Sequence, residues 1–314
     1  MSGVKPIVRS IFSIDVEDWF HILDVPGTPK LSDWVSLPHR VERNFLHLLD
    51  LLDETSSKGT CFFLGWIAQR YPHLVREALG RGHEMASHGF VHQLAYNLGR
   101  EKFFQDALFS KRLLEDIGGQ EVLGYRAAGF SCTEATPWFF EALAKAGYLY
   151  DSSIFPAPRG HGGMRTDEVS PYMVRRGTSE LWEFPISVVD TFGRKCCFFG
   201  GGYLRLFPLF VIRRMVNKVM ADGRPVIFYI HPREIDPAHP RLEMSLKRKF
   251  KSYVNLRTTE VKIRSLLAEF PATTFQNFIR LNNPDLKLVE GTTHPGPTGD
   301  AQARKVLRTG MIRT

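Results

Sequence analysis

The sequence has few cysteines and no metal-binding cysteine pattern. Four cysteines in 314 residues are too few for the disulfide scaffolds of small secreted proteins. The adjacent pair Cys196 and Cys197 would need a strained ring to bridge, and no second Cys-Cys or Cys-His cluster lies near it in the sequence to complete a zinc site. Free thiols are therefore the favoured interpretation.

Long apolar runs are also missing. No stretch approaches the roughly 20 residues that cross a bilayer, and the most apolar stretches, such as residues 203–212, are short and interrupted by Arg and Pro. The opening residues MSGVKPIVRS lack the apolar core of a secretory signal. We therefore expect a cytoplasmic location and no stable insertion into a membrane.

The composition is that of a globular chain. With 43% hydrophobic and 24% charged residues and a mean hydropathy of -0.17, a sizeable core is expected, and fibrous or mostly disordered classes are excluded. Lys and Arg number 41 against 33 Asp and Glu, and the resulting net charge of +8 favours acidic partners such as nucleic acid, anionic lipid or charged glycan. The length fits either two ordinary domains or one large barrel.

Short apolar runs alternate with longer amphipathic segments between residues 10 and 278, which is the pattern of consecutive βα units. We predict helices by their apolar periodicity at residues 40–53, 100–117, 137–146, 208–220 and 258–270. The predicted strands are residues 11–16, 59–64, 84–87, 122–126, 148–151, 181–185 and 226–231. Seven strands separated by helices favour one parallel barrel over two domains.

Two segments break this alternation. Residues 156–176 are rich in Gly, Pro, Arg and Ser, and this composition predicts a long loop over one face. The last residues show no core pattern and carry several basic side chains. We therefore predict one barrel domain with a helical C-terminal extension over residues 1–280 and a disordered basic tail over residues 281–314.

The first predicted strand ends in three acidic residues, within the motif SIDVEDWFH. Strand alternation puts Asp15 and Glu17 on one face, whereas Asp18 either flips or lies in the following turn. Because clustered carboxylates repel one another, something must offset their charge. A metal or acid-base site is favoured over the alternative, an acidic loop that caps the next helix.

Histidines cluster in the motif GHEMASHGFVH. His88 and His92 are four residues apart, so on a helical turn they would share one face and could share one ion. The zincin pattern HExxH does not fit, because Glu84 follows His83, five residues before His88. A pair of surface or core histidines remains the alternative, but the carboxylates at another strand end would complete a site of two histidines and one carboxylate. His83 is assigned mainly a structural role.

Three further polar residues follow predicted strands. Arg126 lies in GYRAAGFS, Asp151 in YLYDSS and His231 in VIFYIHPRE. Any one of them could be a surface residue, but a parallel barrel gathers its active site at the C-terminal ends of its strands. Together they predict an active site at that end.

These motifs resemble those of the NodB-type polysaccharide deacetylases, carbohydrate esterase family four. Within that family, the sequence is most similar to the intracellular branch associated with exosortase-linked exopolysaccharide clusters, including the segment HPREIDPAHPR. The resemblance covers residues 11–278. It implies an α/β fold of the incomplete (β/α)7 barrel type, the NodB homology domain. It also implies a hydrolase of carbon-nitrogen bonds that removes acetyl groups from N-acetylated amino sugars of a bacterial polysaccharide or its precursor.

The resemblance assigns four catalytic residues. Asp15 resembles the catalytic base, and Arg126 resembles the arginine that orients it, although the family pattern R-x-P-[F/Y] reads RAAGF here. His231 resembles the general acid, with Asp151 as the residue that tunes it.

The resemblance also implies a divalent metal, with Zn²⁺ the expected ion. His88 and His92 match the family's metal-binding pair, with Gly89 where Ser or Thr is usual. The third ligand is Glu17 or Asp18, because DVED fits both spacings that the family uses. Asp18 is slightly preferred, since a side chain in the turn can reach an ion above the barrel mouth.

Two other functions stay open. Related barrels use similar ligands on small heterocycles, so a cyclic amide or imide hydrolase resembling allantoinase is the first alternative. The second is a non-catalytic binder of glycan or nucleic acid that uses the basic surface. We expect a glycan containing N-acetylhexosamine as the substrate, and no nucleic-acid partner.

Overall fold

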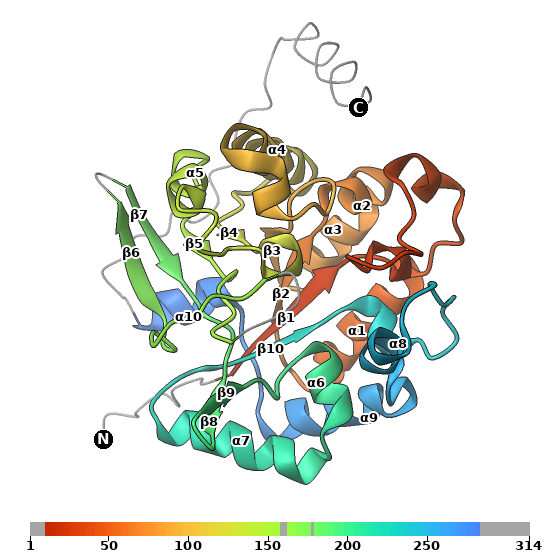
Figure 1. The fold of residues 1–314 in the computed structure, drawn as a ribbon, viewed down its shortest axis with the longest axis vertical. Helices are drawn as coiled ribbons and strands as arrows, with labels where there is room; N and C mark the ends of the chain where they lie inside the picture. Colours follow the sequence, from red (N-terminus) through yellow and green to blue (C-terminus); the bar gives the residue numbers. More distant parts are fainter. Residues whose placement is uncertain (1–9, 158–161, 177–178, 283–314) are drawn as a thin grey trace, which may run out of the picture.

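An eight-stranded sheet curved into a half-barrel forms the centre of the molecule, in a computed structural model that describes residues 10–157, 162–176 and 179–282 (Figure 1). The hydrogen-bonded order is β10-β1-β2-β3-β4-β5-β7-β6. Its strands are β1 (Ser10–Val16), β2 (Gly59–Phe63), β3 (Glu84–Ser87), β4 (Gly124–Tyr125), β5 (Tyr150–Asp151), β6 (Tyr172–Arg176), β7 (Ser179–Glu183) and β10 (Val226–Ile230). All neighbours except β6 and β7 are parallel. The predicted α/β class and incomplete barrel of seven parallel strands are confirmed.

Two antiparallel hairpins were not predicted. β6 lies in the segment 156–176 where a long loop was expected and pairs with β7, which overlaps the predicted strand 181–185, so the loop prediction is wrong at its C-terminal end. β8 (Val189–Thr191) and β9 (Arg194–Cys196) form a separate two-stranded sheet. Strands of three to five residues at an edge carry too little periodicity to stand out in the sequence.

Helices cover the outer side of the half-barrel (Figure 1). The five helices predicted by periodicity are confirmed, and the five further helices of the described residues all span only six to nine residues, which is shorter than a periodicity window. The ten α-helices of the described residues are α1 (Val41–Glu54), α2 (Gly65–Arg70), α3 (Pro72–Gly80), α4 (Ala95–Gly118), α5 (Phe139–Lys145), α6 (Gly201–Leu206), α7 (Leu209–Ala221), α8 (Leu246–Tyr253), α9 (Leu256–Glu269) and α10 (Phe275–Asn282). Within the described residues, none is both long and apolar enough for a membrane span.

Alternation along each strand divides the core into two layers. In β1, Ile11 belongs to the cluster inside the half-barrel, whereas Phe12 and Ile14 belong to the larger cluster between sheet and helices. In β10, Ile227 and Tyr229 are inside by the same rule. Because side chains on a strand alternate between faces, the position of a residue along the strand decides whether it reaches the inside of the barrel.

The predicted tail at residues 281–314 lies almost wholly outside the described residues, which end at 282. Its disorder therefore stays a prediction, as does the assignment of residues 1–280 to one domain.

Candidate active site

The C-terminal ends of four parallel strands bring the predicted residues together. Asp15 lies in β1 on the inner face, and Glu17 continues the same alternation just beyond the strand. His88 directly follows β3, Arg126 follows β4 and His231 follows β10. All five side chains are buried or nearly so.

Glu17, His88 and His92 form a buried group with the composition of a metal site. One ligand atom from each lies within 4.8 Å of the others. His88 Nδ1 lies 2.7 Å from the carbonyl oxygen of Arg126, a contact that selects the tautomer in which Nε2 is left for an ion. The Nδ1 of His92 has no hydrogen-bond partner among the described residues. One carboxylate and two imidazoles are the donors of a catalytic Zn²⁺ site with an open position, so these residues fit a divalent ion.

The two histidines are brought together by a loop, so the expected helical turn is wrong. Residues 88–94 follow β3 without regular structure, and both Gly89 (φ +72°) and His92 (φ +52°) are left-handed. A Cβ at Gly89 would lie 2.8 Å from a carboxylate oxygen of Asp106, which accepts a hydrogen bond from the Phe90 amide. Glycine at this position therefore suits both the backbone angle and the close approach of Asp106.

The structure distinguishes Glu17 from Asp18, the two candidates for the metal-binding carboxylate. Asp18 caps the 3-10 turn η1 (Trp19–His21) by accepting the Trp19 amide at 2.8 Å through Oδ1. Its Oδ2 accepts the amides of Arg40 and Val41 at 2.9 and 3.2 Å, where α1 begins. Both oxygens are thus occupied by backbone donors, and the preference for Asp18 as the metal ligand does not fit the geometry, which groups Glu17 with the histidines.

Arg126 holds Asp15 as an ionised carboxylate. The fully buried guanidinium donates to Asp15 Oδ1 at 2.7 Å and to the Ser13 hydroxyl at 2.8 Å. Its other nitrogens donate to the carbonyl and hydroxyl oxygens of Ser152. Burial by itself would raise the pKa of Asp15, but the charges of Arg126, His88 and His231 outweigh it and lower that pKa. Asp15 is therefore oriented and kept charged, as the predicted base requires.

His231 lies between two carboxylates. Its Nε2 is 2.9 Å from Glu17 Oε1 and 3.8 Å from Asp15 Oδ2, and its Nδ1 is 2.5 Å from Glu234 Oε1. Burial would lower the pKa of His231, but Glu17 and Glu234 raise it to about 9. Glu234 lies in the 3-10 turn η4 (Pro232–Ile235) and also pairs with the buried Arg205 at 3.0 Å. His231 is thus held protonated at neutral pH.

Asp151 does not take the position expected of the residue that tunes His231. In β5, Tyr150 faces the inside of the barrel, so alternation turns Asp151 toward the helix layer. There its carboxylate oxygens accept hydrogen bonds from the amide and the hydroxyl of Ser153. In the sheet, Asp151 is aligned with Glu183 of β7. Glu234 occupies the position next to His231 instead, and this is a correction of the prediction.

Sequence reasoning also missed Glu234, Arg205 and His21. The motif HPRE contains a signal for Glu234, because a tight turn after His231 brings the residue three positions later back to the imidazole. Arg205 gave no signal in the sequence. His21 ends the motif of the first strand, accepts the Asp18 amide at Nδ1 (2.8 Å) and lines the same cavity as Glu17. His83, by contrast, lies at the other end of β3 and accepts the amide of Gly59.

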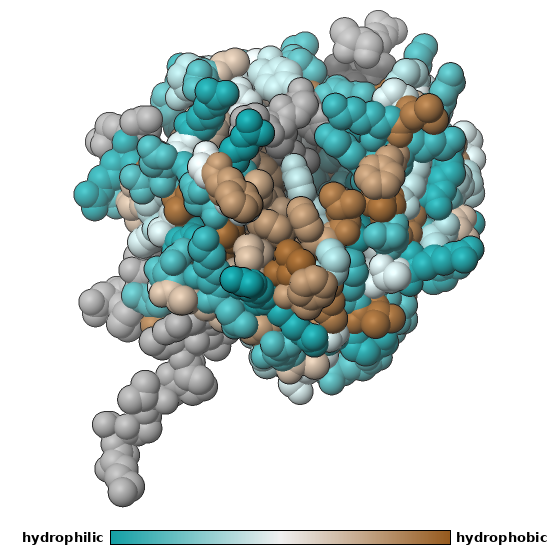
Figure 2. Space-filling view, turned by 60° about the horizontal axis from the view of Figure 1, so that its bottom comes forward, coloured by the Kyte–Doolittle hydropathy of each residue, from teal (hydrophilic) through white to brown (hydrophobic). Residues whose placement is uncertain are grey.

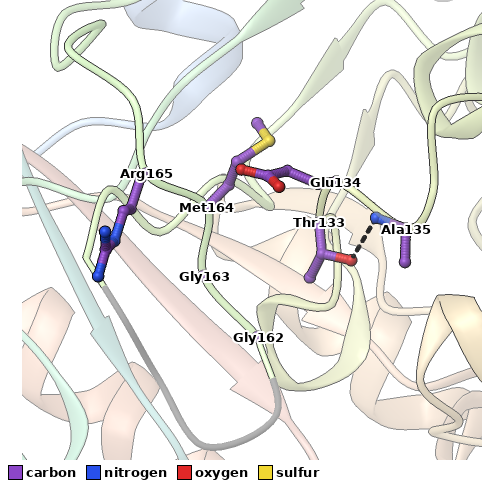
Figure 3. Close-up of a pocket in the computed structure, with 7 residues that line it drawn as sticks. All are labelled: Thr133, Glu134, Ala135, Gly162, Gly163, Met164 and Arg165. Carbon is purple, nitrogen blue, oxygen red and sulfur yellow. Dashed lines mark hydrogen bonds between the residues drawn. The ribbon is translucent and has the colours of Figure 1, made fainter.

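Two cavities lie along the Gly129–Phe130 turn. The first measures about 80 Å³, is lined by residues that include Asp15, Glu17, His88, His92 and His231, and has room for an ion and a few waters. Gly163 donates to the carbonyl of Phe130 on the other side of this turn, where a wider cavity of about 310 Å³ begins. Figure 3 shows Arg165 on one side of this wider cavity, with Thr133 and Ala135 on the other.

Comparison with protein families gives two adjoining matches. Residues 37–150, which contain His88, His92 and Arg126, match the polysaccharide deacetylase model. Over this segment the chain is therefore similar to the polysaccharide deacetylases. Residues 152–280, which contain His231, match a domain of unknown function, DUF3473.

Two curated relatives match this chain over part of their length. A peptidoglycan-N-acetylglucosamine deacetylase of Bacillus cereus is 35% identical over 101 residues, which are 32% of this chain and 46% of the relative. A peptidoglycan deacetylase of Helicobacter pylori is 26% identical over 132 residues, 42% of this chain and 41% of the relative. The chain therefore matches less than half the length of each.

Solved structures agree in fold. A Mycobacterium smegmatis protein provisionally described as a polysaccharide deacetylase has a TM-score of 0.61 at 20% identity, with 94% of this chain and 96% of that chain covered. The Puue allantoinase has a TM-score of 0.56 at 17% identity, with 87% and 90% covered. At such low identity these similarities describe the architecture alone.

Proposed function

We propose that this protein is a metal-dependent N-deacetylase that removes acetyl groups from N-acetylated amino sugars of a bacterial polysaccharide or its precursor. One observation carries the proposal: the buried group Glu17, His88 and His92 lies between an ionised Asp15 and a protonated His231. Hydrolysis of an amide needs an electrophile for the carbonyl, a base for water and an acid for the amine. The described residues supply the base and the acid, and they also supply ligand atoms suited to holding a metal ion as the electrophile.

Glu17, His88 and His92 would hold the divalent ion, for which we propose Zn²⁺. Such an ion acts as a Lewis acid that lowers the pKa of a water and polarises an acetamide carbonyl. Asp15 keeps Oδ1 on Arg126 and presents Oδ2 toward the cavity, where this oxygen accepts the proton of the attacking water. His231 gives its Nε2 proton to the nitrogen as the carbon-nitrogen bond breaks. The products are acetate and a free amino sugar.

The shape of the site supports a glycan larger than one sugar. The small cavity accommodates the reacting acetamide, and the wider cavity beyond Gly129 and Phe130 offers space for a neighbouring residue of the polymer. The Bacillus and Helicobacter relatives, which are peptidoglycan deacetylases, support cleavage of the same type of bond. We further propose a role in exosortase-linked exopolysaccharide synthesis and a cytoplasmic location, because of the resemblance of segment 231–241 to that branch.

Release of acetate from N-acetylglucosamine oligomers tests the proposal. The full chain is stripped with a chelator and assayed before and after addition of Zn²⁺, with ring opening of allantoin measured in parallel. We expect acetate release that is lost on chelation and restored by the ion, without allantoin turnover. Turnover of allantoin alone would favour the cyclic amide hydrolase. Glycan binding without metal and without turnover would contradict both enzymatic functions.

A further inference from the structure

Exposed apolar side chains gather on one part of the surface. Among the described residues, seven of the eleven large hydrophobic side chains that are exposed belong to residues 192–261. The most prominent are Leu206 (43% exposed), Phe210 (71%), Leu246 (85%) and Phe250 (58%). Figure 2 shows apolar surface gathered on the corresponding face, with hydrophilic side chains around it. Clustering of this kind marks an interaction site more often than chance exposure does.

The elements that carry these side chains adjoin one another. Arg205 of α6 donates to the carbonyl oxygen of Lys251 in α8 at 2.8 Å, so the two helices are in contact. Leu206 and Phe210 lie on either side of the short junction between α6 and α7. We call the exposed residues Leu206, Phe210, Leu246, Phe250, Lys247 and Lys251 the α8 face.

The same region carries the positive charge of the molecule. Residues 192–261 contain fourteen Lys and Arg against five Asp and Glu, a net charge of +9, whereas the whole chain has only +8. Residues outside this segment therefore sum to a net negative charge. Three lysines of α8, Lys247, Lys249 and Lys251, have no ion-pair partner in the part of the chain that the structure describes. Unpaired, exposed lysines are available to an anionic partner.

The pattern within α8 is that of a helix lying in a membrane interface. Its sequence LKRKFKSY places Leu246 and Phe250 one turn apart on the outer side, and Lys247 and Lys251 on the adjoining stripe. Ser252 is the buried position. A polyanion such as nucleic acid would use the lysines, but it offers nothing to an aliphatic side chain that is 85% exposed. The bilayer interface accommodates both stripes at once.

The α8 face also lies beside the candidate active site. Arg248 lines the cavity that contains Glu17 and His92, and it donates to the carbonyl oxygen of Leu23 at 3.1 Å. One side of α8 thus forms part of the cavity wall, while its outer side carries the apolar and basic stripes. A partner bound to the outer side would bring its surface to the rim of the cavity.

We propose that the α8 face docks onto an anionic phospholipid membrane, with Leu246 and Phe250 entering the headgroup region and Lys247 and Lys251 contacting lipid phosphates. The protein then lies on the membrane surface. A consequence, which rests on the proposed function, is that the substrate is a glycan carried on a lipid anchor, delivered to the cavity at the membrane surface.

Co-sedimentation with vesicles tests the docking without substrate or metal. The full chain is mixed with phosphatidylcholine vesicles with and without phosphatidylglycerol, at low and high salt. We expect binding only to the anionic vesicles, weakened by salt. The variants K247Q/K251Q and L246S/F250S should each lower the partition coefficient on the order of tenfold. Because the rest of the chain is intact, binding through any other basic segment would be unchanged by them.

Matched controls lie on other helices. K102Q/R112Q removes two exposed charges from α4, and L281S removes an exposed apolar side chain from α10. Both should bind vesicles as the wild type does. The proposal is overturned if the wild type does not bind, if it binds neutral vesicles equally well, if the α8 variants bind normally, or if it binds DNA or an anionic glycan in preference to vesicles.

The expectation that the substrate is a glycan on a lipid anchor is tested by a separate activity measurement. The α8 variants should deacetylate a soluble oligosaccharide at the wild-type rate but lose activity toward the same sugar on vesicle-borne lipid. Vesicle binding should persist in Glu17→Gln, so a failure of the proposed chemistry leaves the docking result standing. Equal activity of wild type and α8 variants on the lipid-borne sugar would contradict the substrate consequence.

Discussion

Two pairs of buried carboxylates lie at the ends of strands of the same sheet, one pair at the end of β1 and the other on β5 and β7, and they behave in opposite ways. Burial alone would raise the pKa values of Asp15 and Glu17, but Arg126, His88 and His231 lower that of Asp15, and His92 and His231 lower that of Glu17. Asp151 and Glu183 face each other, and burial raises the pKa of Asp151 to about 6 and that of Glu183 well above its usual range. Burial alone therefore makes a carboxylate hold its proton, whereas burial beside cations makes it a base at neutral pH.

The largest expected effect tests the ionised pair. Asp15→Asn removes the base, so kcat for acetate release should fall by a factor on the order of 10² to 10⁴. Metal content should be unchanged, because Asp15 is outside the proposed ligand group. The matched control is Glu84→Gln, a buried carboxylate at the opposite end of β3 that accepts hydrogen bonds from Thr60 and Tyr150. Wild-type turnover by Asp15→Asn would remove Asp15 from the mechanism.

A smaller effect concerns the acid between its two carboxylates. His231 must be protonated to donate, so activity should be retained up to its pKa of about 9 and fall as pH rises further. Glu234→Gln removes one of the charges that raise this pKa, and the alkaline limb of the pH-rate profile should move to lower pH. Asp236→Asn, which alters a carboxylate that pairs with Arg40 and Arg43, should leave that limb in place. An unmoved limb in Glu234→Gln would contradict the assigned tuning role.

The smallest effect tests the protonated pair. Because the folded protein holds a proton on Asp151 up to a higher pH than the unfolded chain does, this pair destabilises the fold as pH rises from about 4 through about 6. The variant Asp151→Asn has no proton to lose at this position. As pH rises across this interval, its free energy of unfolding should therefore increase relative to that of the wild type. Urea titrations at several pH values measure the difference. A loss of stability relative to the wild type across this interval would contradict the raised pKa of Asp151, and a large loss of activity would show that Asp151 acts in the site.

Much of this fold is visible in the sequence. The seven parallel strands were predicted because buried strands require continuous apolar runs such as residues 226–230, bounded by turns. The amphipathic helices were found for a similar reason, as in α1, where Val41, Phe45 and Leu48 are all buried. Short helices and edge hairpins carry too few residues for either signal.

The site was less predictable, and strand alternation explains much of the difference. Counting every second residue from Ile11 reaches Asp15 and Glu17, which favours Glu17 over Asp18 as the carboxylate inside the barrel. The same count from Tyr150 excludes Asp151 from the inner face. Arg205, in contrast, meets Glu234 only because α6 packs beside the turn after β10, and no local pattern reports such a contact.

The central claim is that Glu17, His88 and His92 hold a metal ion, and a matched pair of variants tests it most directly. Zn²⁺ bound per chain is measured after dialysis in the wild type, Glu17→Gln and Asp18→Asn. We predict one ion per wild-type chain and affinity lowered by on the order of a hundredfold or more in Glu17→Gln. Asp18→Asn should bind zinc normally while losing on the order of 1 kcal/mol or more of stability, because an amide nitrogen would replace the Oδ2 that accepts the amides of Arg40 and Val41. Loss of zinc in Asp18→Asn with full binding in Glu17→Gln would contradict the account.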